Sequence, residues 1–421
     1  MSDPVAPVAA DEATVRSRVG GLLARLRFTP STRDGAPMFW FLTLLVAGLT
    51  GIGLVFVLSA SSVMSMEHGH SAWYFFERQF VFALLGTVAY LVGARLDYRL
   101  WERWAPRLLV VTVVSLFLVL IPGIGRYVNG ARRWIGLNSL IGFQPSEIAK
   151  LVLLLFAARL LSHRVEQLDD WRRATMPLLV VTVAMCFLVV LEPDLDAAME
   201  IALVAMGVLF AAGIPRKHLA AIVGGAAAAV SVLAIAAPYR LSRLLTFMHP
   251  GRDLSNKSYQ INQALIALGN GGWTGVGLGN GHAKWLFLPA AHTDFIFAII
   301  GEETGMLGGL FVLALFGAFA AIGCRIAMRA PDRFAMLLAA GVTTWVCGQM
   351  LLNVAMVIGM APVSGTPLPF ISAGGSSLVV LMFAVGILAN VARHCALPTP
   401  TRSSAHPALR RTHGVRVFPS A

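Results

Sequence analysis

The sequence predicts an all-α polytopic membrane protein with about ten transmembrane helices and a large extracytoplasmic loop between helices 7 and 8. The chain is 57% hydrophobic and only 13% charged, whereas about a quarter of the residues in soluble domains are charged. The mean hydropathy is +0.74. Apolar stretches of about 17–25 residues, long enough to cross a bilayer core of about 30 Å, recur along the chain.

The apolar stretches give the order of the predicted spans. They cover residues 38–60, 79–95, 105–122, 145–161, 176–192, 197–213, 218–237, 295–323, 334–359 and 371–392. An even number of spans places both ends of the chain on the same side of the membrane. The membrane domain is therefore expected over residues 38–393.

Positive charge predicts which side this is. Arginines recur in the loops on the side of the two ends, as at Arg95, Arg99, Arg164, Arg172 and Arg325. Short loops rich in Arg and Lys stay in the cytoplasm, so both termini are predicted to be cytoplasmic. Because the net charge of +12 is explained in this way, no nucleic-acid partner is expected.

Two loops on the opposite side also carry cations. These are Arg126, Arg132 and Arg133 in one loop, and Arg240, Arg243, Arg252, Lys257 and Lys284 in the other. Cations on the disfavoured side indicate an anionic partner there, such as a phosphate or pyrophosphate. The alternative is that they are ordinary solvated loop charges.

The second of these loops, residues 238–292, is far longer than a helix connection needs, and such loops are usually functional or disordered. Apolar residues at helical spacing over Tyr259–Leu268 predict a helix lying at the membrane interface. The glycine-rich stretch that follows lacks the flanking strand of a dinucleotide site. The terminal segments, 1–37 and 394–421, are predicted to be disordered basic tails in the cytoplasm.

The stretch Gly142–Lys150 opens the fourth span with "GFQPSEIAK". Pro145 suits the first position of a helix and Glu147 suits its first turn. Lys150 lies one turn deeper, where a charged side chain is costly unless it is paired or hydrated, so a functional role is expected. A purely local ion pair between Glu147 and Lys150 is the alternative.

Further acidic residues open the sixth and eighth spans. In "LEPDLDAAME", Asp194 suits a turn or helix start, and Asp196 is interpreted as a solvated turn residue. Asp294 stands where the outer loop enters the eighth span, so it can face an external cavity or simply cap the helix. Glu302 and Glu303 are expected to hold neighbouring helices together, and His292 is interpreted as a surface histidine.

The stretch Gly365–Leu378, "GTPLPFISAGGSSL", opens the tenth span. Its prolines and glycines predict a broken helix entry with exposed backbone N–H groups, which can bind an anion. Small residues such as Ser376 and Ser377 are also what tight helix packing requires.

Together these motifs resemble the SEDS family (shape, elongation, division, sporulation), polytopic peptidoglycan glycosyltransferases that include FtsW and RodA. The resemblance runs from about Phe39 to Arg393. It rests on the motifs "LSASSV", "NGARRWI", "FQPSEIAK", "EPDL", "SYQINQALIALGNGGWTGVGLGNG", "HTDFIF", "GEETG" and "PLPFISAGGSSL". Within the family, the first span and the chain length look more like the FtsW branch than the RodA branch.

The resemblance implies that lipid II, a disaccharide-pentapeptide on undecaprenyl pyrophosphate, is polymerised into β-1,4 glycan at the outer leaflet. The family's essential aspartate falls on Asp294, which would be the general base. The substrate- or pyrophosphate-binding candidates are Lys150, Arg133, Glu147, Arg243, Gln260, Gln263 and Ser376. No cofactor is certain. A divalent cation, Mg²⁺ or Mn²⁺, is an alternative to these side chains as the group that stabilises the departing pyrophosphate.

The expected setting is the bacterial inner (plasma) membrane, at the division septum, with a class B penicillin-binding protein (FtsI-like) and other divisome proteins as partners. Three alternatives stay open: a lipid II flippase or transporter, a RodA-like elongation polymerase, and a scaffold that only recruits the transpeptidase. The chain departs from the family pattern at Asp196, Ala197, Ser258, Ala290 and Ala373. No role is assigned to Ala290 or Ala373.

Overall fold

The computed structural model describes residues 36–67, 69–128, 131–136, 142–236, 256–285 and 287–395. The predicted tails lie almost wholly outside these ranges, and so do Arg243 and much of the outer loop. The predictions made for those segments therefore stay predictions.

Helices dominate the described residues, and each predicted span has a helix. They are α2 (Ala36–Glu67), α3 (Tyr74–Arg95), α4 (Tyr98–Leu120), α5 (Pro145–Ser162), α6 (Met176–Leu191), α7 (Leu195–Ala212), α8 (Arg216–Ala236), α11 (Ile296–Met328), α12 (Arg333–Val357) and α13 (Gly375–His394). A 3-10 turn (Val165–Gln167) and a π-helical turn (Trp171–Thr175) precede α6.

Eight helical segments among the described residues are long and apolar enough to cross a membrane, so the chain is an integral membrane protein. They contain α2, α3, α4, α6, α7, α11, α12 and α13. Helix α5 is apolar but carries Glu147, Lys150 and Arg159, and α8 begins with charged residues. The all-α membrane fold is confirmed, whereas the count of ten spans stays a prediction.

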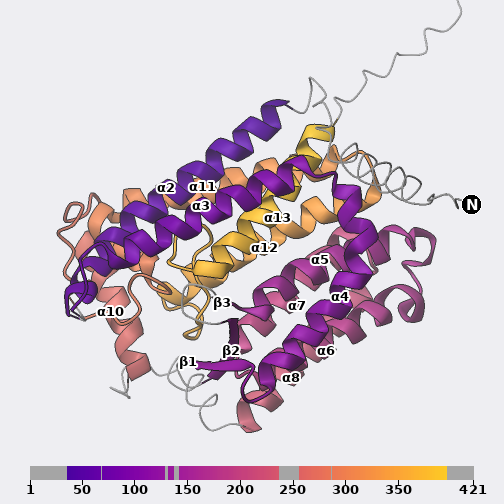
Figure 1. Ribbon diagram of the computed structural model, residues 1–421, viewed down its shortest axis with the longest axis horizontal. Coiled ribbons are helices and arrows are strands. Elements are labelled where there is room, and N and C mark those ends of the chain that lie inside the picture. The colour runs from indigo at the N-terminus through magenta and orange to yellow at the C-terminus, as the bar shows by residue number, and fades with distance from the viewer. Residues whose placement is uncertain are drawn as a thin grey trace, which may run out of the picture.

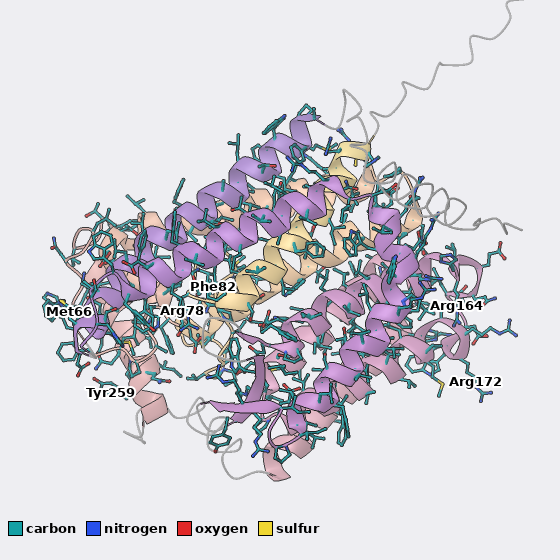
Figure 2. All side chains as sticks on the ribbon, viewed as in Figure 1. Met66, Arg78, Phe82, Arg164, Arg172 and Tyr259 are labelled. Carbon is teal, nitrogen blue, oxygen red and sulfur yellow. The ribbon has the colours of Figure 1, made fainter. Side chains whose placement is uncertain are left out.

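The helices form two groups, which are visible in Figure 1. Helices α2, α3, α11, α12 and α13 lie on one side and α4 to α8 on the other. The groups meet where α12 packs against α5 and α7. Helix α3, from the start of the chain, packs along α13, from its end. Figure 2 places Arg164 and Arg172 at the opposite end of the bundle from Met66 and Tyr259, as the predicted topology requires.

A small antiparallel sheet was not predicted from the sequence. Its strands are β1 (Gly125–Val128), β2 (Ala131–Gly136) and β3 (Gly142–Phe143), with Arg126 opposite Trp134. Tyr127, Trp134 and Ile135 favour extended backbone, but strands this short carry little periodic signal. The sheet holds Arg133 and Trp134 at the outer end of the bundle.

The outer loop contains the predicted amphipathic helix, α10 (Asn256–Gly271), which packs against α11. Ile261 and Ala264 are buried as expected, whereas Leu265 is exposed and Ala267 takes its place on the buried face. Helix α11 bends at Gly305, whose φ of 70° is non-helical. Helix α13 begins at Gly375, so residues 371–374, which were expected to be helical, belong to the loop before it.

Helix α2 packs at Gly53 directly against the backbone of the loop before α13. A Cβ atom built on Gly53 would lie 2.7 Å from the Ile371 Cα atom and 2.7 Å from the Phe370 carbonyl oxygen. Both contacts are with backbone, which cannot rotate away. Glycine at position 53 therefore fixes how closely the loop approaches α2.

We predict that Gly53→Val destabilises the protein, because the new side chain must displace residues 370–371. Overpacking of this kind typically costs about 1–3 kcal/mol, which thermal unfolding in detergent measures. Gly48→Val is the matched control, since a Cβ atom at Gly48 meets nothing within 4 Å. Equal melting temperatures for the two variants would contradict this packing.

Candidate active site

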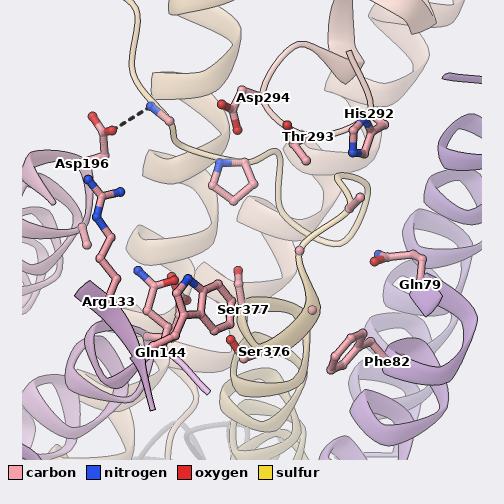
Figure 3. Close-up of a pocket in the computed structure, with 18 of the residues that line it drawn as sticks. Gln79, Phe82, Arg133, Gln144, Asp196, His292, Thr293, Asp294, Ser376 and Ser377 are labelled. Atoms are coloured by element: carbon pink, nitrogen blue, oxygen red, sulfur yellow. Dashed lines mark hydrogen bonds between the residues drawn. The ribbon is translucent and has the colours of Figure 1, made fainter. Parts of the chain in front are cut away.

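A cavity of about 480 Å³ opens between the two groups of helices. Its walls come from α3, β2, the starts of α5 and α7, the segment before α11 and the loop before α13 (Figure 3). The polar and charged residues that line it are Arg78, Gln79, Arg133, Gln144, Glu147, Asp194, Asp196, Glu200, His292, Thr293, Asp294, Ser376 and Ser377. The cavity therefore brings together residues from the stretches 142–150, 191–200 and 365–378 with Asp294.

Asp294 lies at the cavity wall, directly before α11. Phe295 occupies the N-cap position of that helix, so Asp294 lies one residue before the N-cap. Its backbone N–H donates to the Ala290 carbonyl at 3.1 Å. Its own carbonyl accepts from Asn353 Nδ2 at 2.7 Å. These two hydrogen bonds hold the backbone of Asp294 in place. The residue lines the cavity.

Two amides on α12 organise the neighbouring loop. Asn353 Nδ2 also donates to the Thr366 carbonyl at 2.8 Å, and Gln349 Nε2 donates to the Pro367 carbonyl at 3.0 Å. Both side chains are buried. Neither residue was predicted from the sequence, although a polar side chain inside an apolar span often marks a functional site.

The "GEETG" motif anchors the end of the outer loop. The Glu302 carboxylate accepts from the backbone N–H groups of His282 at 2.9 Å and Ala283 at 3.1 Å. Glu303 pairs with Lys284 at 3.2 Å and accepts from the Ser59 hydroxyl of α2 at 2.6 Å. The pair was expected to hold neighbouring helices together. Glu303 does so through Ser59 of α2, whereas Glu302 holds the loop at residues 282–283.

Lys150 is buried between two carboxylates. Its ammonium lies 2.8 Å from Glu147 Oε2 and also pairs with Glu200 of α7. It sits 5.3 Å from the centre of the Trp345 ring, and its side chain is only 2% exposed. Glu147 and Glu200 line the cavity, whereas Lys150 lies behind them. The local pair with Glu147 exists, but Glu200, 50 residues away, was not foreseen as a partner.

Arg133 lines the cavity from β2 and holds the turn between α6 and α7. Its guanidinium donates to the Glu192 carbonyl at 3.1 Å and to the Pro193 carbonyl, and lies 3.9 Å from the Asp194 carboxylate. Asp194 is the N-cap residue of α7 and accepts from Gln144 Nε2 at 2.8 Å. A turn held this firmly keeps Arg133 at the rim of the cavity.

The opposite wall contains residues that can receive an anion. Helix α13 begins there, with Gly374 as an N-cap residue that has no side chain to cap the first turn. Ser376 is buried, and its Oγ atom has no hydrogen-bond partner among the described residues. Arg78 of α3 also lines the cavity. The sequence analysis proposed Ser376 but missed Arg78, which lies inside an apolar helix.

His292 is buried rather than on the surface, which corrects the sequence interpretation. Its ring lies 4.8 Å from that of Phe75, and its carbonyl accepts from the Ala373 N–H at 3.0 Å. Burial lowers the pKa of its imidazole to about 4. The imidazole is therefore neutral at pH 7 and contributes no positive charge to the cavity.

Two of the predicted site residues, Gln260 and Gln263, are not brought to the cavity. Both lie on α10 and are half-buried. Among the described residues, no group of three or more His, Cys, Asp or Glu side chains is arranged to hold a metal ion.

Comparison with known proteins gives a consistent result. A family model described as "Cell cycle protein", covering FtsW, RodA and SpoVE, matches residues 39–396. The probable peptidoglycan glycosyltransferase FtsW of Trichlorobacter lovleyi is 42% identical over 83% of this chain and 92% of its own length. Stage V sporulation protein E of Bacillus subtilis is 37% identical over 82% of this chain and 94% of its own length.

Solved structures agree in fold. A chain from a peptidoglycan synthase complex that coordinates polymerisation and crosslinking superposes with a TM-score of 0.71 at 29% identity, covering 84% of this chain and 97% of that one. Thermus thermophilus RodA gives a TM-score of 0.62 at 28% identity, covering 85% and 98%. The chain therefore belongs to the FtsW/RodA/SpoVE family of cell cycle proteins, the SEDS family that its motifs resemble.

Proposed function

We propose that this protein is a peptidoglycan glycosyltransferase that polymerises lipid II into β-1,4 glycan strands at the outer leaflet. The observation that carries the proposal is a carboxylate, Asp294, held from its backbone on the wall of a cavity that also contains arginines and a helix N-terminus. The names of its relatives, at about 40% identity over most of the chain, support the same activity.

In this proposal Asp294 is the general base. It takes the proton from the 4-hydroxyl of the acceptor GlcNAc as that oxygen attacks the anomeric carbon of the lipid-linked MurNAc. The bond from that carbon to the pyrophosphate oxygen breaks, and undecaprenyl pyrophosphate leaves with the electron pair. A single displacement on an α-linked donor gives the β-1,4 bond.

Negative charge gathers on the departing pyrophosphate, so preorganised donors should stabilise it. Arg78 and the start of α13, with the Ser376 hydroxyl, form such a set on one wall. A helix N-terminus favours an anion through its N–H groups and its dipole. Arg133 at the rim is the second cationic position, and it can meet the pyrophosphate of the other lipid substrate.

Lys150 acts indirectly in this proposal. Its ammonium offsets two buried glutamates that would otherwise repel each other and an incoming anion. It thereby keeps Glu147 and Glu200 in place at the cavity wall. A divalent cation, Mg²⁺ or Mn²⁺, stays the one cofactor candidate, and no step of the mechanism is routed through it.

The biological setting is also a proposal. The similarity to FtsW supports a role in cell division at the septum of the inner membrane, with both termini in the cytoplasm. The structural similarity to a peptidoglycan synthase complex supports a class B penicillin-binding protein as partner. A lipid II flippase is the alternative function, and a RodA-like role in elongation is the alternative setting.

We predict that Asp294→Asn lowers the rate of glycan polymerisation by about 10²–10⁴-fold, the usual contribution of a general base. The measurement is polymer formation from lipid II by the purified protein, with and without its transpeptidase. Asp169→Asn, at an exposed carboxylate away from the cavity, is the matched control. Undiminished polymerisation by Asp294→Asn would eliminate the base assignment, and lipid II movement between leaflets without polymer would support the flippase.

A second prediction concerns the buried charges around Lys150. Lys150→Met leaves Glu147 and Glu200 without their cation, and breaking a buried pair typically costs about 3–5 kcal/mol of folding free energy. The double variant Lys150→Met/Glu200→Gln keeps the net charge of the group, so it should recover at least half of that loss in thermal unfolding.

The double variant should also regain polymer formation, because Lys150 does not line the cavity. Glu200 does line the cavity, so Glu200→Gln alone is the control. A double variant that folds normally but makes no polymer, while Glu200→Gln alone still makes it, would show that the ammonium itself acts on the substrate. That outcome would contradict the indirect role.

A further inference from the structure

One hydrogen bond crosses the cavity from one group of helices to the other. Asp196, in the first turn of α7, accepts through Oδ2 from the backbone N–H of Gly365 at 2.8 Å (Figure 3). Gly365 belongs to the loop between α12 and α13. Asp196 is also a position at which this chain departs from the family pattern, and the solvated-turn interpretation gave it no partner. The structure instead places it on the cavity wall.

Gly365 lies between two carboxylates. A Cβ atom built on it would be 3.1 Å from Asp196 Oδ2 and 3.9 Å from Asp294 Oδ2. The loop backbone at this point is therefore the element that separates the proposed base from Asp196. Any movement of Gly365 changes the space beside the Asp294 carboxylate.

The same loop is tied to the backbone of Asp294. Asn353 Nδ2 donates both to the Asp294 carbonyl and to the Thr366 carbonyl, one residue after Gly365. Gln349 holds the next carbonyl, that of Pro367. Residues 365–367 and Asp294 are consequently held as one unit on α12, and Asp196 is the contact that reaches this unit from α7.

We propose that Asp196 is a positioning residue. Its hydrogen bond to Gly365 holds residues 365–367 against the start of α7 and so fixes the place of Asp294 in the cavity. The proposal rests on the glycosyltransferase function proposed above. A carboxylate that accepts from a backbone N–H makes a charge-assisted hydrogen bond, which is shorter and stronger than a neutral one. The first turn of α7 favours the ionised carboxylate through the helix dipole.

Two other roles for Asp196 give different results. If Asp196 only stabilises the first turn of α7, its loss lowers the melting temperature but leaves catalysis in the folded protein unchanged. If its negative charge acts on Asp294 or on a cation, the neutral amide of Asn cannot replace it. Figure 3 shows Arg133 pointing toward Asp196 from β2, so this charge-based role has a physical basis.

The test compares Asp196→Ala with Asp196→Asn in the purified full-length protein, with lipid II titrated to separate kcat from KM. A misplaced base should lower kcat by about 10–100-fold in Asp196→Ala, with KM changed less than kcat. Asp196→Asn keeps an acceptor oxygen for the Gly365 N–H and should retain at least about a third of the wild-type kcat. Asp169→Ala is the surface control.

A double-mutant cycle with Gly365→Ala tests the contact itself. The new methyl group would press on Asp196 Oδ2 at 3.1 Å, so Gly365→Ala should lower kcat when Asp196 is present. It should cost markedly less in the Asp196→Ala background, because contacting residues are not additive. Melting temperatures of the same four proteins give a second double-mutant cycle, which does not depend on activity.

Three outcomes would contradict a positioning role for Asp196. They are a wild-type kcat in Asp196→Ala, equal losses of kcat in Asp196→Ala and Asp196→Asn, or additive effects of the Asp196 and Gly365 substitutions. Absence of polymer with the wild-type protein is a different result. It would contradict the proposed function, and the melting-temperature cycle would still decide whether Asp196 and Gly365 interact.

Discussion

The site depends on one buried amide. Asn353 lies near the C-terminal end of the apolar helix α12 and donates its two N–H groups to the carbonyls of Asp294 and Thr366. A buried amide is costly unless it is hydrogen-bonded, so this contact strongly favours a single arrangement of the two segments. The amide binds the backbone of Asp294 and not its side chain, and Asp294 lines the cavity.

Charge in an apolar bundle sets the second constraint. Isolated buried charges are expensive, and this protein pairs them: Lys150 with Glu147 and Glu200, and Lys284 with Glu303. Glu147 and Glu200 line the cavity, whereas Lys150, Lys284 and Glu303 are not among the residues that line it. The group around Lys150 holds the wall formed by α5 and α7, and the pair of Lys284 with Glu303 fixes the end of the outer loop that leads to Asp294. The buried ion pairs thus hold the surrounding elements in place, while Arg78, Arg133 and Asp294 line the cavity.

The sequence predicted best those features that depend on residues close together in the chain. Apolar length located the helices, and proline, glycine and acidic residues marked the entries that line the cavity. The sheet was missed because strands such as Gly142–Phe143 are too short to show a period. Glu200 as a partner of Lys150, and Asp196 as a partner of Gly365, could not be predicted, because each contact joins segments that are 50 or more residues apart in the chain. His292 was misjudged because its burial depends on Phe75, which comes from another helix.

We infer that Asn353 holds Asp294 in the position that the proposed mechanism requires. The most direct test is glycan polymerisation by Asn353→Ala in reconstituted membranes, measured together with lipid II binding. If the amide positions the base, the polymerisation rate falls at least about tenfold, while lipid II binds with nearly unchanged affinity, which also reports that the variant is folded. A variant that binds lipid II and polymerises it at the wild-type rate would contradict the account.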